Sequence, residues 1–154
     1  MMTVAVGSPA PEFTLATDQG EISLAALKGR PAVVYFYPKD DTSGCTREAI
    51  GFSCLADEFA KAGATVIGIS PDTVEKHGKF RAKHKLSVAL GSDPEHQVAE
   101  LYGAWGEKSL YGKKYFGIIR STFLVDANGT VAKVWPKVKV EGHAEEVLAA
   151  VMAL

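Results

Sequence analysis

Short apolar runs separated by polar and glycine-containing stretches recur along the chain. Residues 32–36 and 65–69 are continuous apolar, β-branched runs, which is typical of central strands buried on both faces. Apolar positions at helical spacing, including Phe52 and Phe59, predict a helix over about residues 46–61. The pattern therefore combines buried strands with an amphipathic helix between them.

Turn signals flanked by strand-like residues predict two hairpins. The first joins residues 13–15 to residues 21–24 around the Asp-Gln-Gly turn at 18–20. The second joins residues 121–125 to residues 130–135 around an Asp-Ala-Asn-Gly turn. These hairpins add antiparallel strands near both ends of the chain.

The remaining segments are shorter or more polar. A capped polar helix is expected over about residues 72–84, and a closing helix over residues 142–152. Residues 87–90 predict a short strand and residues 94–102 a short helix. Glycine and aromatic residues crowd positions 103–117, which are therefore expected to form a loop.

The order of these elements predicts an α/β fold. Strand–helix alternation implies parallel pairing, and the late hairpin makes the sheet mixed. We therefore expect a thioredoxin-like fold, with a mixed central sheet flanked by helices and an N-terminal hairpin. A chain of 154 residues without repeats or linkers predicts a single domain over residues 1–154.

Composition and charge exclude several classes of function. Seventeen basic against eighteen acidic side chains give a net charge of -1, which argues against a dedicated nucleic-acid binder. No run of 18 apolar residues predicts a membrane span. The N-terminal stretch does not resemble a signal peptide, so a cytoplasmic location is expected. Two cysteines are too few for a disulfide scaffold or a four-cysteine zinc site.

One of the two cysteines, Cys45, falls in the first turn of the predicted helix that follows the first buried strand. Unpaired amide groups and the helix dipole favour an anion there, so Cys45 is a candidate nucleophilic thiolate. Thr42 offers a hydroxyl three residues earlier. Gly44 leaves access to the sulfur, and Pro38 stiffens the preceding loop.

Glu48 shares a helical face with Cys45, where a carboxylate alone would oppose a thiolate. Arg120 is the candidate cation that binds Glu48 and also directs N–H donors to the sulfur. Plainer interpretations stay open, because Cys45 alone fits a small buried hydrophobe. Thr42 also fits a helix cap or turn residue, and Arg120 a surface ion pair.

The segment PKDDTSGC at residues 38–45 matches the Pro-x-x-x-Thr-x-x-Cys signature of peroxiredoxins, which are thiol-dependent peroxidases of the thioredoxin-like fold. Residues 36–48, 101–108, 117–123 and 7–13 resemble the bacterioferritin-comigratory-protein/PrxQ branch of that family. The resemblance extends from about residue 6 to the C-terminus.

The resemblance implies a function for each candidate residue. Cys45 would be the peroxidatic cysteine, which reduces hydrogen peroxide and organic hydroperoxides and becomes a sulfenic acid. Thr42 and Arg120 would activate it, Pro38 would shield it, and Glu48 matches an acidic residue of the branch. No metal or organic cofactor is implied. Thioredoxin or a glutathione-based reductant, and a monomeric state, are expected for this branch.

The chain departs from the branch at the resolving cysteine. The two positions where the branch carries it hold Ile50 and Arg81. Cys54 is the second thiol, but nine helical residues place it on the opposite face, about 13 Å along the axis from Cys45. We therefore expect Cys54 in the core and an external thiol as the reductant. The alternative is an unusual disulfide in which Cys54 resolves the sulfenic acid.

Two other functions are compatible with the expected fold. A thiol–disulfide oxidoreductase would normally carry a Cys-x-x-Cys pair, which Cys45 lacks. A non-catalytic thioredoxin-like binding module would not need a reactive thiol. The histidines His77 and His84 and the basic run at residues 79–85, which includes Arg81, are expected to be solvated.

Overall fold

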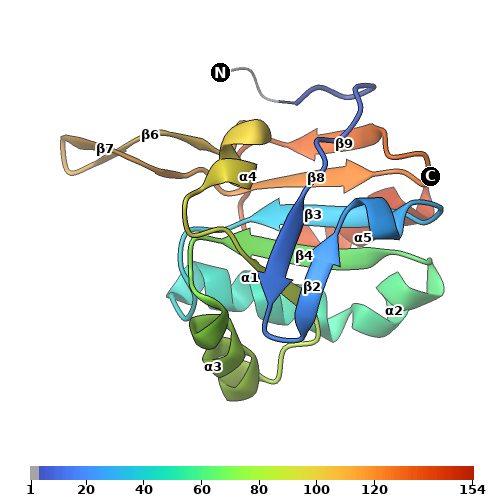
Figure 1. Ribbon diagram of the computed structural model, residues 1–154, viewed down its shortest axis with the longest axis horizontal. Helices are drawn as coiled ribbons and strands as arrows, with labels where there is room; N and C mark the ends of the chain where they lie inside the picture. The colour runs from blue at the N-terminus through green and yellow to red at the C-terminus, as the bar shows by residue number, and fades with distance from the viewer. Residues whose placement is uncertain (1–3) are drawn as a thin grey trace.

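A seven-stranded mixed sheet forms the centre of the structure, a computed structural model that describes residues 4–154 (Figure 1). Residues 1–3, which the single-domain prediction and the interpretation of the N-terminus included, lie outside the described residues. In chain order, the strands are β1 (Thr14–Thr17), β2 (Gly20–Ser23), β3 (Ala32–Phe36), β4 (Thr65–Ser70), β5 (Ala89–Ser92), β6 (Trp105–Leu110), β7 (Lys113–Ile118), β8 (Ser121–Val125) and β9 (Val131–Trp135).

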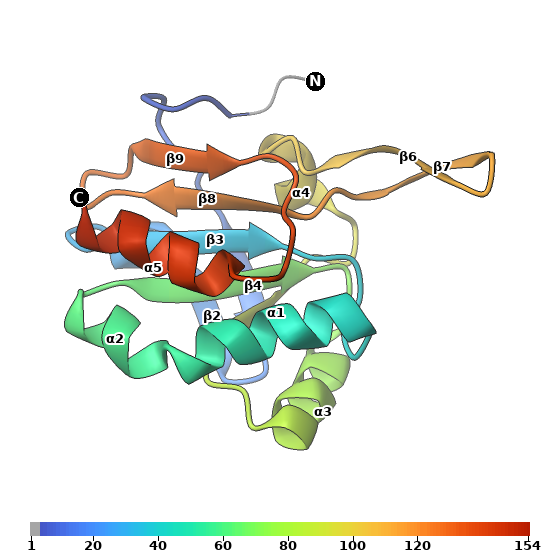
Figure 2. The same ribbon diagram turned by 180° about the vertical axis from the view of Figure 1, so that it is seen from behind.

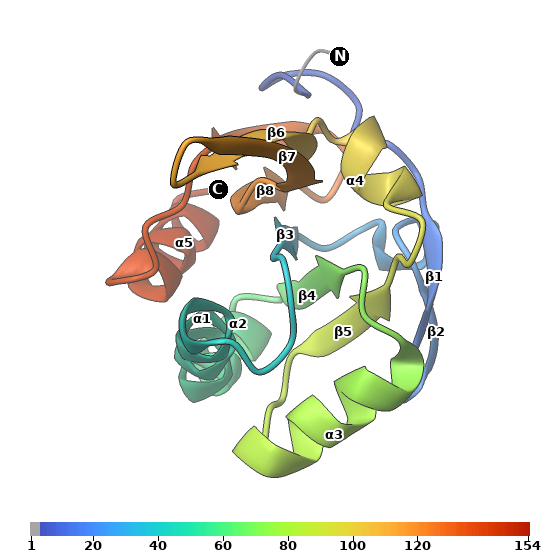
Figure 3. The ribbon, with the colours of Figure 1, turned by 90° about the vertical axis from the view of Figure 1, so that its left-hand side faces the viewer.

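Helices cover both faces of this sheet (Figure 2, Figure 3). Helices α1, α2, α3 and α5 pack against one face, and α4 packs against the other, where it shares a hydrophobic cluster with residues of the N-terminal hairpin at the edge of the sheet. The helices are η1 (Ala25–Leu27, a 3-10 turn), α1 (Ser43–Cys54), α2 (Ala56–Lys61), α3 (Val74–His84), α4 (Gln97–Leu101) and α5 (His143–Met152).

The strand order is β2-β1-β5-β4-β3-β8-β9. Strands β3, β4 and β5 are parallel, and the other neighbours pair antiparallel. This arrangement follows from the sequence, because helical crossovers link the parallel strands and tight turns link the hairpins. The predicted mixed sheet, flanking helices and N-terminal hairpin are all present.

Strand β3 shows why a continuous apolar run belongs at the centre of the sheet. Val34 and Phe36 pack into one hydrophobic cluster, whereas Val33 and Tyr35 pack into the cluster on the opposite face. All five residues of β3 are buried. The strand is therefore fixed from both sides, and the loop that follows it starts from a rigid position.

Two predicted elements differ from the structure. The expected helix over residues 46–61 is two helices, because the backbone leaves helical geometry at Leu55, which ends α1 and begins α2. The expected loop over residues 103–117 is instead the hairpin of β6 and β7. Its two-residue turn, Tyr111 and Gly112, has positive φ at both positions, as this type of hairpin requires.

Within the described residues, every helix is too short or too polar to cross a bilayer.

Candidate active site

Cys45 lies just after the loop that joins β3 to α1 (Figure 2). Helix α1 begins at Ser43 with Thr42 as its N-cap, so Cys45 is in the first helical turn, as the sequence predicts. Cys45 is 1% exposed and belongs to the hydrophobic cluster between the sheet and helices α1, α2, α3 and α5. The position combines the electrostatic field of a helix N-terminus with exclusion of water, and both strengthen charge interactions at the sulfur.

Arg120 connects Cys45 with Glu48. One terminal nitrogen, Nη2, donates to Cys45 Sγ at 3.2 Å, and Nη1 donates to Glu48 Oε1 at 2.5 Å. Arg120 immediately precedes β8, whose pairing with β3 sets Ser121 opposite Phe36. The loop of residues 37–42, the candidate catalytic loop that leads to Cys45, begins directly after Phe36. Strand pairing therefore brings together groups that are 75 residues apart in the sequence.

Burial decides the charge balance between these side chains. Desolvation raises the pKa of Glu48 to about 7, although Arg120 acts in the opposite direction. Burial by itself lowers the pKa of Arg120, but Glu48 and Cys45 outweigh this effect and the pKa is raised. Glu48 Oε2 is buried and makes no hydrogen bond. Near neutral pH, Arg120 is thus a full cation beside a carboxyl group that is only partly ionised.

Thr42 is close in sequence to this group but is bonded elsewhere. Its hydroxyl donates to the carbonyl oxygen of Lys39 at 2.9 Å, and it makes no capping bond to the helix. The hydroxyl thus stabilises the turn of the catalytic loop, which agrees with the turn-residue interpretation for this state of the site.

Gly44 makes room for the guanidinium. A Cβ atom at this position would lie 3.3 Å from Arg120 Nη2. The sequence suggested that Gly44 gives substrate access, whereas its geometric effect is to let Arg120 approach the sulfur. Pro38 is half-buried in the same loop, just after the buried Tyr37.

Comparison with known proteins supplies the decisive observation. The model of the AhpC/TSA family matches residues 6–134. Peroxiredoxin Bcp of Bacillus subtilis is 49% identical over 148 residues, which cover 96% of this chain and 94% of the relative. The chain belongs to the AhpC/TSA family of peroxiredoxins.

Solved structures agree with this assignment. A cysteine-to-serine variant of Xylella fastidiosa PrxQ superposes with a TM-score of 0.93 at 33% identity, covering 99% of this chain and 98% of that one. The bacterioferritin comigratory protein of Xanthomonas campestris has a TM-score of 0.87 at 44% identity and covers 92% of this chain and 90% of its own. The predicted thioredoxin-like fold, the Bcp/PrxQ branch and the thiol-dependent peroxidase activity are thereby confirmed, in preference to a thiol–disulfide oxidoreductase or a non-catalytic binding module.

A buried polar cluster that the sequence analysis missed fixes the catalytic loop of this peroxiredoxin. Asp40 Oδ2 lies 2.6 Å from His77 Nδ1, and Asp40 Oδ1 accepts from the Tyr37 hydroxyl at 2.6 Å. Asp72 Oδ2 accepts from the backbone amide of Asp40 at 2.7 Å. His77 Nε2 lies 3.0 Å from the carbonyl oxygen of Gly91. His77 was expected to be solvated but is fully buried, because these loop and sheet groups surround it.

Asp40, Asp72 and His77 are also close enough together to be considered as metal ligands. Both carboxylate oxygens of Asp40, Oδ2 of Asp72 and both ring nitrogens of His77 already have hydrogen-bond partners within the protein. The cluster is therefore explained as a structural link between the catalytic loop and α3.

A second cation near the site, Lys108, was also missed, because residues 103–117 were expected to be a loop. Lys108, on β6, donates to the carbonyl oxygen of Ile118 at 2.8 Å. Burial and then Arg120 lower the pKa of Lys108, and Cys45 acts in the opposite direction. The ammonium group thus lies within electrostatic range of both Arg120 and the Cys45 sulfur.

The expectation that Cys54 is a core residue is wrong. Cys54 is exposed at the last position of α1, because nine helical residues place it on the face opposite the buried Cys45. Helix α1 is continuous between the two cysteines, and nine residues separate their Cα atoms by about 13 Å along the axis. A disulfide needs about 4.4–6.8 Å, so this folded state keeps the two thiols apart.

Arg81, in the position where the branch carries a resolving cysteine, is not solvated as expected. Its guanidinium forms two hydrogen bonds with Asp18 in the turn between β1 and β2. It also donates to the carbonyl oxygens of Leu86 and Val88 at 2.8 Å each. Arg81 is therefore a structural link between α3, the following segment and the N-terminal hairpin.

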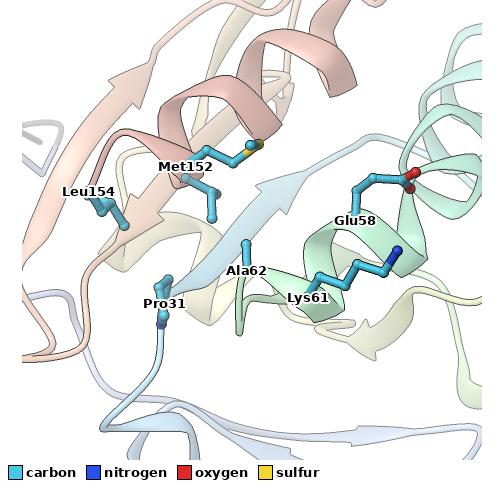
Figure 4. A pocket seen from close by; sticks show the side chains of 7 residues that line it. Pro31, Glu58, Lys61, Ala62, Met152 and Leu154 are labelled. Atoms are coloured by element: carbon cyan, nitrogen blue, oxygen red, sulfur yellow. The ribbon is translucent and has the colours of Figure 1, made fainter.

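A cavity of about 470 Å³ lies far from these residues, between α2 and the end of α5 (Figure 4). Pro31, which precedes β3, is among its lining residues, whereas the catalytic loop follows β3. The cavity is therefore at the opposite end of that strand and does not contribute to the peroxidase site.

Proposed function

We propose that Cys45 is the peroxidatic cysteine of this enzyme. Its thiolate attacks the terminal oxygen of a hydroperoxide, so that an S–O bond forms as the O–O bond breaks. The sulfur is oxidised to a sulfenic acid, and the leaving oxygen takes up a proton to become water or an alcohol. The contact of 3.2 Å between Arg120 Nη2 and Cys45 Sγ is the observation that carries this proposal.

Arg120 has the geometry to stabilise the transition state. Negative charge moves from the sulfur to the leaving oxygen during the attack, and a fixed cation beside both atoms lowers the barrier. The raised pKa of Glu48, about 7, supports this role, because a neutral Glu48 leaves the charge of Arg120 available to the reacting atoms. Thr42 belongs to the proposed site as the residue that shapes the loop, with Pro38 and Gly44.

Hydrogen peroxide and organic hydroperoxides are the proposed substrates. The Xanthomonas relative is described with its alkyl peroxide reduction activity, which supports the organic class for this chain. The reaction needs no metal or organic cofactor, since the sulfur itself accepts the oxygen atom.

We further propose that an external thiol recycles the enzyme. Cys54 lies nine residues from Cys45 along an unbroken helix. The two positions where the branch carries a resolving cysteine hold Ile50 and the hydrogen-bonded Arg81. The external thiol forms a mixed disulfide with Cys45 and releases water, and a second thiol then frees the enzyme. Thioredoxin and glutathione-based systems supply thiols of this kind. We propose that the enzyme works as a monomer in a reducing compartment such as the cytoplasm.

A pair of cysteine variants tests both proposals. Reduced Cys45→Ser protein is expected to lose peroxide consumption, whereas Cys54→Ser should keep the wild-type rate with dithiothreitol as reductant. Mass spectrometry after one equivalent of peroxide should find the sulfenic acid on Cys45 in the Cys54→Ser variant. Full activity of Cys45→Ser would contradict the first proposal. A disulfide between Cys45 and Cys54 in oxidised wild-type protein would contradict the second.

A further inference from the structure

The hairpin of β6 and β7 extends away from the body of the molecule (Figure 1, Figure 2). Its two strands pair with each other from Trp105 opposite Ile118 to Leu110 opposite Lys113, and they form a separate two-stranded sheet. An isolated hairpin gains little stability by itself. A projecting hairpin of this length therefore calls for an explanation other than packing of the core.

Large apolar side chains cover the outer part of this hairpin. Tyr111 at the turn is 96% exposed and Phe116 is 65% exposed, and Leu110 and Tyr115 are exposed on the face of the hairpin opposite Phe116. Exposed aromatic residues are enriched at protein interaction sites, where they supply much of the binding energy. The hairpin thus presents a surface suited to a protein partner.

The charge of the hairpin indicates the kind of partner. Residues 105–118 contain three lysines and one glutamate, a net charge of +2, in a chain whose net charge is -1. Glu107 lies 3.6 Å from Lys114, and within residues 4–154 no carboxylate forms an ion pair with Lys113. A second copy of this hairpin would bring like charges together, whereas an acidic partner surface would be attracted.

The hairpin is continuous with the peroxidase site. Strand β7 ends two residues before Arg120, and Lys108 joins the two strands at this inner end through the Ile118 carbonyl. The hairpin and the first turn of α1 lie at the same end of the sheet (Figure 3). A protein bound along the hairpin is therefore held beside Cys45.

We propose that the β6–β7 hairpin is the docking arm for the protein thiol that reduces the Cys45 sulfenic acid. This proposal rests on the proposed function, because it needs the sulfenic acid as its target. The partner is a dithiol protein with acidic and apolar groups around its reactive cysteine. Its thiol displaces the sulfenic hydroxyl as water to give a mixed disulfide. Its second thiol then attacks that bond, which leaves an oxidised partner and the Cys45 thiol.

The test compares a protein thiol with a small thiol. A Tyr111→Ser/Phe116→Ser variant weakens the apolar contacts, and a Lys113→Glu/Lys114→Glu variant reverses the charge. Met152→Ser/Leu154→Ser is the matched control, since it removes two exposed apolar side chains at the opposite end of the molecule. Each protein is assayed with a bacterial thioredoxin and its reductase, and separately with dithiothreitol.

The kcat/KM for thioredoxin is expected to fall at least about tenfold in both hairpin variants, which corresponds to about 1.4 kcal/mol. The rate with dithiothreitol, the single-turnover oxidation of Cys45 by peroxide and the behaviour of the control should stay within about twofold of wild type. In the charge-reversed variant the salt dependence of the thioredoxin reaction should also change sign, because the net charge of the hairpin changes from +2 to -2.

The other outcomes separate this proposal from the proposed function. The docking proposal would be overturned if both hairpin variants had the same kcat/KM for thioredoxin as the wild-type enzyme. It would also be overturned if only small thiols reduced the wild-type enzyme. If size-exclusion chromatography found a dimer for wild type and monomers for both hairpin variants, the partner of the hairpin would be a second copy of this chain and the docking proposal would be overturned. Failure of peroxide to oxidise Cys45 in wild type would refute the proposed function itself.

Discussion

The Arg120 guanidinium serves two partners that differ in chemistry and burial. Its two terminal nitrogens reach the Cys45 sulfur and the Glu48 carboxylate, and Gly44 lies so close that an added methyl group would touch one of them. Small displacements of Arg120 therefore matter more for the reaction than for the fold. Gly44 offers a way to separate the two effects.

Gly44→Ala is expected to slow the oxidation of Cys45 by peroxide about tenfold, because the new Cβ displaces Arg120 Nη2 by a few tenths of an ångström. Stopped-flow measurement of single-turnover oxidation gives this rate. The melting temperature should stay equal or rise, since alanine favours the helix over glycine.

The matched control is Gly51→Ala in the same helix, whose Cβ would make an ordinary contact of 3.4 Å with Ala144. The control should oxidise at the wild-type rate. Equal rates for Gly44→Ala and wild type would show that the position of Arg120 does not limit the reaction.

Among the elements, α3 has the densest polar attachment to the rest of the fold. His77 binds the catalytic loop through Asp40, and Lys83 and His84 both bind Asp41 in that loop. Arg81 attaches the same helix to the N-terminal hairpin. Helix α3 therefore connects the catalytic loop with a distant edge of the sheet.

Arg81→Met is expected to lower the free energy of unfolding by roughly 2–4 kcal/mol, because Asp18 and two carbonyl groups lose their partner. Urea unfolding followed by circular dichroism measures the change. Lys79→Met, an exposed change on the same helix, should alter the stability by at most about 0.5 kcal/mol. Similar stabilities for the two variants would contradict the structural role of Arg81.

The elements also show what the sequence could and could not predict. Strand β3 was predictable because five consecutive apolar residues require burial on both faces, and all five are buried. The β6–β7 hairpin was not, because most of its residues are exposed and no alternation of apolar and polar positions marks its strands. The burial of His77 depends on Asp40 and Gly91, which are distant in sequence, so no local pattern indicates it.

The site was predictable to a similar extent and for similar reasons. Glu48 next to Cys45 required a cation, and this requirement pointed to Arg120 before any geometry was known. The bond from the Thr42 hydroxyl to Lys39 depends on backbone geometry at the start of α1, which is set by packing rather than by residue type. The exposure of Cys54 follows from helical periodicity, because nine residues place it opposite the buried Cys45.

Two buried groups make the stability of the molecule depend on pH in opposite directions. Burial lowers the pKa of His143 from about 6.5 to about 4, so the unfolded chain binds the proton first and the stability contribution of His143 is lost as pH falls through this range. Burial raises the pKa of Glu48 to about 7, so its stability contribution is lost as pH rises from about 4.5. Between about pH 4.5 and 6.5 the two effects on the free energy of unfolding oppose each other.

Single substitutions should reveal this compensation. Glu48→Gln is expected to become more stable with rising pH in that window, at up to about 1.4 kcal/mol per pH unit relative to wild type. His143→Gln should show the opposite slope, and the double variant should have a slope close to wild type. Urea unfolding at several pH values measures these slopes. Parallel profiles for wild type and both single variants would contradict the two pKa shifts.

The pairing of β3 with β8 has a consequence for the order in which the enzyme is made and folded. The cysteine follows the third strand of the chain, but its guanidinium arrives only with the eighth, 75 residues later. Contacts of such long range form late, because a large loop must close first. A nascent or partly unfolded chain therefore carries Cys45 without Arg120 beside it, and the reaction proposed for Cys45 begins only when the centre of the sheet is complete.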